Sequence, residues 1–157
     1  MKQLRINLDE LAFILHRGKL LDMYCFLNTS TGEILNIPSD RKTLETMFKL
    51  PENSTLLTTT DLVSRMVPPG VNFLTIPDLF SQNVFNLMSE FISSIQDSFP
   101  AEAESLLRAL QQEGGWTEFH KIVRSNDELL AKYIRFRDRF FESSARRWLE
   151  EKNIELV

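Results

Sequence analysis

The residues best suited to hold a charged group lie near the end of the chain, where arginines alternate with aromatic side chains. Arg137 stands four residues from both Tyr133 and Phe141, so on a helix it flanks an apolar stripe. A guanidinium in that place is partly removed from water and needs a fixed hydrogen-bonding partner. Two interpretations stay open, a structural pair with a carboxylate or a site for an anion. The candidate partners for such a pair are the carboxylates of Glu33, Glu90 and Asp97.

Further cations are candidates for contact with an anion or with a partner protein. They are His120, Lys121, Arg135 and Arg139. On the predicted last helix, Arg135 and Arg139 fall on the face opposite to the aromatic stripe, where charges of both signs are typical of a solvated surface. A histidine that stands alone on a helix, as His16 and His120 do, is more often structural than a catalytic base.

Several sequence patterns that carry catalysis are missing. The chain has no Gly-x-Ser-x-Gly nucleophile turn and no Gly-Lys-Ser/Thr phosphate loop. Cys25 is the one cysteine, and the two histidines are far apart, so neither an internal disulfide nor a His/Cys metal site is predicted. Gly114-Gly115 before a helix could cradle a phosphate, but a plain turn between helices is the simpler interpretation. We therefore predict no catalytic residue, no metal site and no cofactor.

The aromatic residues recur at spacings of three and four along the last helix, which indicates a helix with one broad apolar face. A long amphipathic helix usually buries such a stripe, so we interpret it as core. The alternative is an aromatic platform for bases or for a partner helix, and base stacking needs a positive groove that a chain of net charge −4 does not supply. The predicted core anchors are Trp116, Phe119, Tyr133, Phe136, Phe140 and Trp148.

Composition points away from nucleic acid and membranes. The 157 residues are 43% hydrophobic and 25% charged, ordinary values for a globular protein with one core. A negative chain has no electrostatic attraction for nucleic acid or anionic lipid. The first residues lack the apolar run of a signal peptide, and no stretch approaches the roughly 20 apolar residues of a membrane span. We expect a cytoplasmic protein, monomeric or homodimeric, that binds neither nucleic acid nor membrane.

The first half of the chain mixes helix and strand. Asn7 followed by Glu10 has the spacing of a capping box and predicts a helix over 8–17. Two β-forming segments, 23–27 and 34–37, are separated by turn residues that include a glycine, which predicts a hairpin. Further on, the sequence predicts a helix over 40–50 capped by Ser39, one helical turn at 61–66 and a third strand over 71–76.

The second half predicts helices only. Apolar residues from Val84 to Ile95 mark one face of a helix, Pro100 suits the first turn of the next, and Ser125 with Glu128 caps the last, over 126–152. The expected fold class is α+β, a small N-terminal antiparallel sheet packed against a helical C-terminal half. We expect a single domain over 1–157, with a mixed part over 1–77 and a helical part over 78–157.

Three segments, in this order, resemble uncharacterised protein family number 158, a group of small bacterial proteins. The first is the hairpin with Thr31-Gly32-Glu33, the second is Gly114-Gly115-Trp116 with Phe119, and the third runs over 133–154. Family members often carry arginines where this chain has Thr117 and Glu118. The resemblance implies this architecture and supplies no activity, substrate or cofactor.

These observations favour a non-enzymatic binding or regulatory protein that acts through protein contacts. The first alternative is an anion, nucleotide or RNA binder that uses the arginine-aromatic helix. The second is a hydrolase or transferase whose motif is not recognised. The expected partner is another protein.

Overall fold

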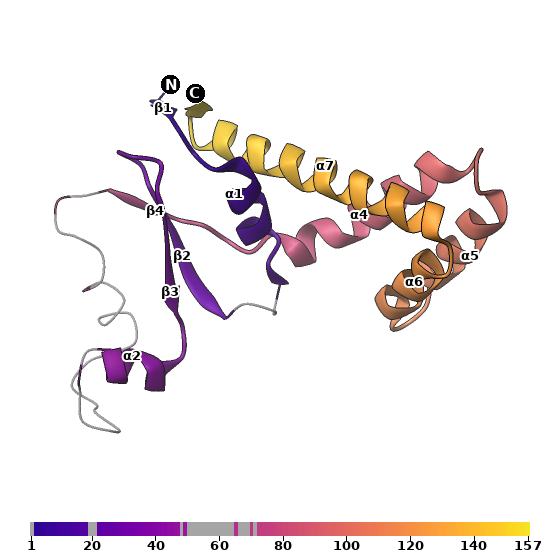
Figure 1. Cartoon of the computed structure of the whole chain (residues 1–157), viewed down its shortest axis with the longest axis horizontal. Helices are drawn as coiled ribbons and strands as arrows, with labels where there is room; N and C mark the ends of the chain where they lie inside the picture. Colours follow the sequence, from indigo (N-terminus) through magenta and orange to yellow (C-terminus); the bar gives the residue numbers. More distant parts are fainter. Residues whose placement is uncertain (1, 19–21, 48, 50–64, 66–69, 71) are drawn as a thin grey trace. The chain divides into compact units, whose positions relative to one another are not determined.

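The structure is a computed structural model of the chain, and its fold class is α+β as predicted (Figure 1). It forms two compact units, Met1–Leu79 with Ala145–Val157, and Phe80–Ser144. Whether these units behave as one domain stays a prediction. The expected helical turn at 61–66 lies outside the described residues, apart from Arg65. The structure describes residues 2–18, 22–47, 49, 65, 70 and 72–157.

The first unit contains the predicted hairpin and the predicted third strand. Its antiparallel sheet has the order β3-β2-β4, with strands β2 (Met23–Asn28), β3 (Ile34–Pro38) and β4 (Phe73–Thr75). Side chains on alternate positions of β2, Cys25 and Leu27, are buried on one face of the sheet. Ile37 of β3 is paired with Tyr24, so it lies on the opposite face, and it is buried there. Both faces of the sheet therefore carry buried side chains.

The hairpin turn is fixed by Asn28 and Gly32. The side-chain oxygen of Asn28 accepts hydrogen bonds from the backbone amides of Ser30 and Thr31, at 2.8 and 3.1 Å. Gly32 has a φ of +83° and lies against the carbonyl of Arg5, where a Cβ atom would clash. Glycine is therefore required here both by the backbone angle and by the close approach.

Helix α1 (Leu8–Leu15) begins as the capping pattern predicts, because the amide of Glu10 donates to the side chain of Asn7 at 3.1 Å. It ends two residues before the predicted end. Beyond it, Arg17 donates to the carbonyls of Ile76 and Pro77, and so joins the end of α1 to the segment that follows β4.

Helix α2 (Arg41–Met47) lies within the predicted range, but Ser39 does not cap it. Asp40 does so instead, since its carboxylate accepts from the amide and from the hydroxyl of Thr43, at 3.1 and 2.6 Å. A charged oxygen at a helix start is the stronger acceptor. The hydroxyl of Ser39 is left buried with no hydrogen-bond partner among the described residues.

A second sheet, which the sequence did not predict, pairs the two ends of the chain. Strands β1 (Lys2–Leu4) and β5 (Ile154–Leu156) are parallel, with Lys2 opposite Ile154 and Leu4 opposite Leu156. Asn153 adopts a left-handed conformation with a φ of 58°, and its carbonyl accepts from the amide of Lys2.

The second unit is built from helices α4 (Phe80–Ile95), α5 (Pro100–Leu110), α6 (Gly115–Arg124) and the part of α7 (Asp127–Glu151) that precedes Ala145. Among the described residues, none of these or the other helices has the length and apolar character needed to cross a membrane. The buried residues of its core are Met88, Phe91, Ile92, Ile95, Ala103, Leu106, Phe119, Val123, Leu129 and Tyr133.

Aromatic rings hold three of these helices together. The ring centroid of Phe91 on α4 lies 5.2 Å from that of Tyr133, 5.6 Å from Phe136 and 6.2 Å from Phe119. Phe119 on α6 in turn lies 5.6 Å from Tyr133. These separations are typical of favourable edge-on and tilted ring pairs. Phe91 is therefore the point at which α4, α6 and α7 meet.

The connections of this unit follow the predicted glycine and proline positions, with one correction. Pro100 occupies the first turn of α5, and Gly114, with a φ of 75°, precedes α6. Ser125 does not cap α7, because its hydroxyl donates back to the carbonyl of Ile122. Asn126 caps the helix instead, accepting from the amides of the two residues at 128 and 129.

Trp148 belongs to the first unit and is 4% exposed. We predict that Trp148→Ala lowers the free energy of unfolding by about 3–5 kcal/mol, because a large buried side chain is lost and a cavity remains. The exposed neighbour provides the control, since Arg147→Ala should change it by less than about 0.5 kcal/mol. Urea denaturation of both variants measures this, and equal stability of wild type and Trp148→Ala would contradict the assignment of Trp148 to the core.

Candidate binding site on the last two helices

His120 lies where α6 meets α7. Its half-buried ring stands edge-on to Trp116, with centroids 4.0 Å apart, and edge-on to Tyr133, with centroids 5.6 Å apart. Trp116 and His120 are one helical turn apart on α6, while Tyr133 comes from α7. The sequence therefore places an imidazole at the border between the aromatic core and the surface.

Arg137 lies one turn beyond Tyr133 on α7, with 39% of its side chain exposed. Its Nε and Nη2 atoms donate to Oδ1 of Asp138, at 3.2 and 3.1 Å. The carboxylate beside it is thus that of the next residue, not one from the middle helices. Because Arg137 is on the flank of α7, its guanidinium is not drawn into the core, and an ion pair this exposed contributes little to stability.

Tyr133 is deeply buried, and its hydroxyl has no hydrogen-bond partner among the described residues. Burial raises the pKa of Tyr133 to about 12, and the nearby charge of Arg137 opposes this only in part. The phenol is therefore uncharged at neutral pH and is unsuited to act as a base.

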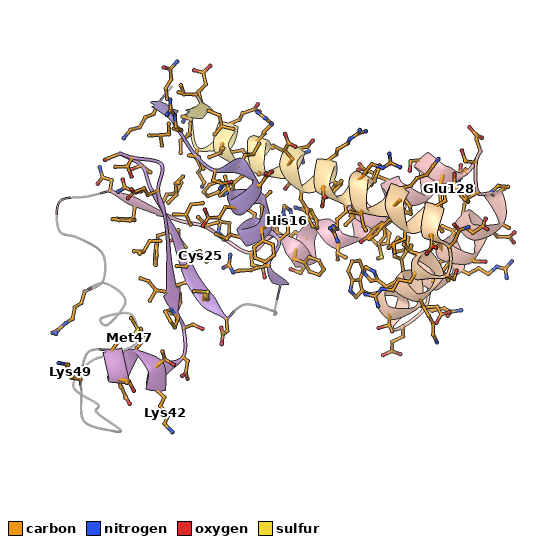
Figure 2. All side chains as sticks on the ribbon, in the orientation of Figure 1. His16, Cys25, Lys42, Met47, Lys49 and Glu128 are labelled. Atoms are coloured by element: carbon orange, nitrogen blue, oxygen red, sulfur yellow. The ribbon has the colours of Figure 1, made fainter. Side chains whose placement is uncertain are left out.

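His120 is also uncharged at neutral pH. Burial lowers its pKa, and the positive charges of Arg124 and Arg137 lower it further. His16, at the end of α1 (Figure 2), is buried too, with its Nδ1 atom 2.8 Å from the carbonyl oxygen of Ala12. Its pKa is likewise lowered by burial, so both imidazoles are stable in the folded protein as neutral groups.

The other cations predicted from the sequence do not lie beside His120, Tyr133 and Arg137. Successive residues of a helix are turned by about 100°, so Arg135 and Arg139 lie on the side of α7 away from Arg137. Both are exposed, and so is Lys121 on α6. Arg124 does lie near His120, and its positive charge lowers the pKa of that histidine. This neighbour was not predicted from the sequence. The spacing of four residues between His120 and Arg124 was the signal that could have revealed it.

Of the predicted core anchors, Phe119, Tyr133 and Trp148 are buried, whereas Trp116, Phe136 and Phe140 are half-buried. Trp116 lies at the edge of the second unit's core, where its ring is 5.5 Å from that of Phe80 and 6.2 Å from that of Phe119. Phe140 contacts the ring of Phe141, with centroids 6.3 Å apart. The aromatic stripe therefore extends from the core to the surface.

One side of α7 in the second unit combines apolar side chains with an arginine. Leu130, Ile134 and Phe141 follow helical spacing, and Arg137 lies among them. Ile134 is 38% exposed, and Leu130 and Phe141 are half-buried. We call these four residues the α7 flank. Its chemistry suits contact with another apolar surface more than it suits catalysis.

Nothing in the described part of the chain brings together three or more His, Cys, Asp or Glu side chains in a group that could hold a metal ion. Cys25, on β2 (Figure 2), is buried, and burial raises the pKa of its thiol. A protonated, buried thiol is a poor nucleophile.

Comparison of the chain with protein-family models, with curated proteins and with solved structures found no match. The resemblance to uncharacterised protein family number 158 therefore stays a prediction.

We predict that the protein loses stability as the pH falls below about 6.5. The folded-state pKa values of His16 and His120 lie below the ordinary value of 6.5. The unfolded chain therefore takes up protons first, so this contribution to stability is complete above pH 6.5 and is lost toward the folded-state values. Urea denaturation at several pH values measures it, and greater stability in acid from these groups would contradict it.

The two histidines also allow an internal control. Arg137→Gln removes one of the positive charges near His120, so it should raise the pKa of His120 and leave that of His16 unchanged. NMR titration of both imidazoles checks this, and an equal shift of both would contradict the assigned neighbours.

Proposed function

We propose that this is a non-enzymatic protein that acts by binding another protein through the α7 flank. The observation that carries the proposal is the exposure of Ile134 beside Arg137, on a helix whose adjacent face packs in the core through Tyr133 and Phe136. Interface cores are enriched in aromatic residues and arginine, and the strongest contacts usually come from a few such residues. We further propose a cytoplasmic location, which a single buried cysteine suits.

Rigidity supports the same proposal. Tyr133 and Phe136 fix the inner face of α7 against Phe91. Because the helix backbone is held, the outer side chains of the flank stand at fixed spacings before any partner arrives. A preformed surface binds with a smaller loss of conformational entropy than a surface that orders on binding.

The alternative functions have less support. An anion, nucleotide or RNA binder would need its cations on one surface, but Arg135 and Arg139 lie away from Arg137. A hydrolase or transferase would need an activated nucleophile or base. The titratable groups near the aromatic core, His120 and Tyr133, are neutral at pH 7 and carry no orienting carboxylate among their described hydrogen bonds.

The test is affinity capture from a lysate of the source organism, with wild-type protein and two variants as bait. Ile134→Glu places a charge in the α7 flank and should reduce capture of the partner at least tenfold. Phe85→Glu is the matched control, because Phe85 is an apolar side chain of α4 that is 59% exposed and lies outside the flank. Circular dichroism verifies that both variants fold.

A protein captured equally by all three baits would contradict the proposal, and so would the capture of no protein by the wild type. Recovery of RNA instead of protein, with loss of that RNA in an Arg137→Gln bait, would favour the first alternative.

A further inference from the structure

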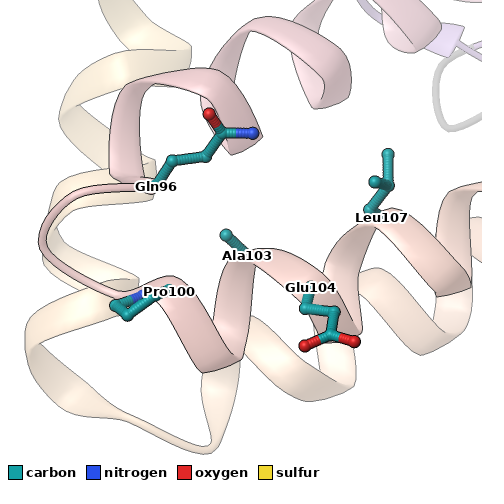
Figure 3. Close-up of a pocket in the computed structure, with 5 residues that line it drawn as sticks. All are labelled: Gln96, Pro100, Ala103, Glu104 and Leu107. Atoms are coloured by element: carbon teal, nitrogen blue, oxygen red, sulfur yellow. The ribbon is translucent and has the colours of Figure 1, made fainter.

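A shallow groove lies on the second unit where α4 ends and α5 begins (Figure 3). Gln96 borders it from the end of α4, and the other lining residues come from successive turns of α5. The space is about 290 Å³, and the residues that line it are Gln96, Pro100, Ala103, Glu104 and Leu107. We call it the α4–α5 groove.

The lining is mainly apolar. Its apolar residues are Pro100, Ala103 and Leu107, and Leu107 has 44% of its surface exposed. Pockets for drug-sized molecules span roughly 300–1,000 Å³ and enclose most of the ligand. An open groove just below that range fits one or two apolar side chains of a docked segment better than a free small molecule.

The surroundings of the groove are acidic. Helices α4 and α5, with the turn between them, hold four acidic residues and one basic residue, which are Glu90, Asp97, Glu102, Glu104 and Arg108. Arg108 is paired with Glu104 at 2.6 Å, and both side chains are about two-thirds exposed. Nearby, Lys132 of α7 lies over the ring of Phe99 at 5.3 Å, so its charge is directed at the turn. Of these charged residues, Glu104 is the one that lines the groove. Over α4, α5 and the turn, with Lys132 included, four carboxylates stand against two cations, so the surroundings of the groove carry a net negative charge.

These features point to one kind of occupant. We infer that the α4–α5 groove docks a basic amphipathic segment of another protein, with an apolar side chain against Leu107 and a lysine or arginine near Glu104 and Asp97. This surface is separate from the α7 flank, so the inference goes beyond the function proposed above. It does not depend on that proposal.

The exposed pair of Arg108 with Glu104 presents little obstacle. A surface pair one helical turn apart contributes little to stability, so an incoming cation can share the carboxylate of Glu104 at small cost. The same carboxylates repel acidic segments. The groove therefore favours a segment that is both basic and apolar.

The experiment uses full-length protein labelled with ¹⁵N and two probe peptides. Both peptides are 15-residue amphipathic helices, one of leucine and lysine and the other of leucine and glutamate. NMR titration at about 150 mM salt follows the backbone amides of Gln96, Ala103 and Leu107. The expected result is a set of saturable shifts confined to the α4–α5 groove, with the lysine peptide only.

Variants separate the apolar and the charged contributions. Leu107→Ser should weaken binding of the lysine peptide about tenfold, and Glu104→Gln should weaken it about threefold with a smaller salt dependence. Ile134→Glu, in the α7 flank, is the matched control and should leave the affinity unchanged. Because of this control, the two proposals are tested separately. Absence of peptide binding at the α4–α5 groove does not contradict the proposed function of the α7 flank, and loss of the partner at the flank does not contradict docking at the groove.

Four results would overturn the inference. They are no saturable shift with the lysine peptide, equal binding of the two peptides, unchanged affinity in Leu107→Ser, and shifts that appear with rising protein concentration alone. The last result would identify a second copy of this chain as the occupant.

Discussion

The second unit depends on the contacts of one phenylalanine ring. Phe91 of α4 touches aromatic rings of both α6 and α7, and two of these rings, Phe119 and Tyr133, also touch each other. A buried aromatic side chain provides much apolar area at a low cost in conformational entropy, so a few rings can hold three helices in place. The same packing leaves the hydroxyl of Tyr133 without a hydrogen-bond partner among the residues that the structure describes, which indicates that apolar contacts outweigh the cost of burying that hydroxyl.

Both binding surfaces inferred for this unit follow from that core. The inner face of α7 is buried against α4 and α6. The α7 flank lies next to that face and is left partly exposed. In the same core, α5 buries Ala103 and Leu106 and leaves Leu107 at the surface. The two surfaces differ in charge, since the α7 flank carries Arg137 and the α4–α5 groove is bordered by carboxylates. A single partner that covers both would need charges of both signs.

Local patterns in the sequence predicted those elements whose structure depends on their own residues. Helical periodicity identified the buried face of α4, and the turn residues identified the hairpin. Two caps were placed one residue too early, because a serine stands directly before Asp40 and before Asn126, and all four residues can cap a helix. The β1–β5 pair was missed because strands of three residues show no periodicity, and their pairing joins opposite ends of the chain. The position of Arg137 was predictable from spacing, but its partner depended on which side of α7 the other helices cover.

The most direct test of this account is hydrogen–deuterium exchange of the backbone amides in wild type and in Phe91→Leu. If one aromatic core holds α4, α6 and residues 127–144 of α7, these segments should open together, with similar protection in the wild type. Phe91→Leu should then speed exchange in all three by a similar factor, while the strands of the first unit keep their rates. Faster exchange in α4 alone, or α6 already exchanging freely in the wild type, would contradict the claim that Phe91 unites the three helices.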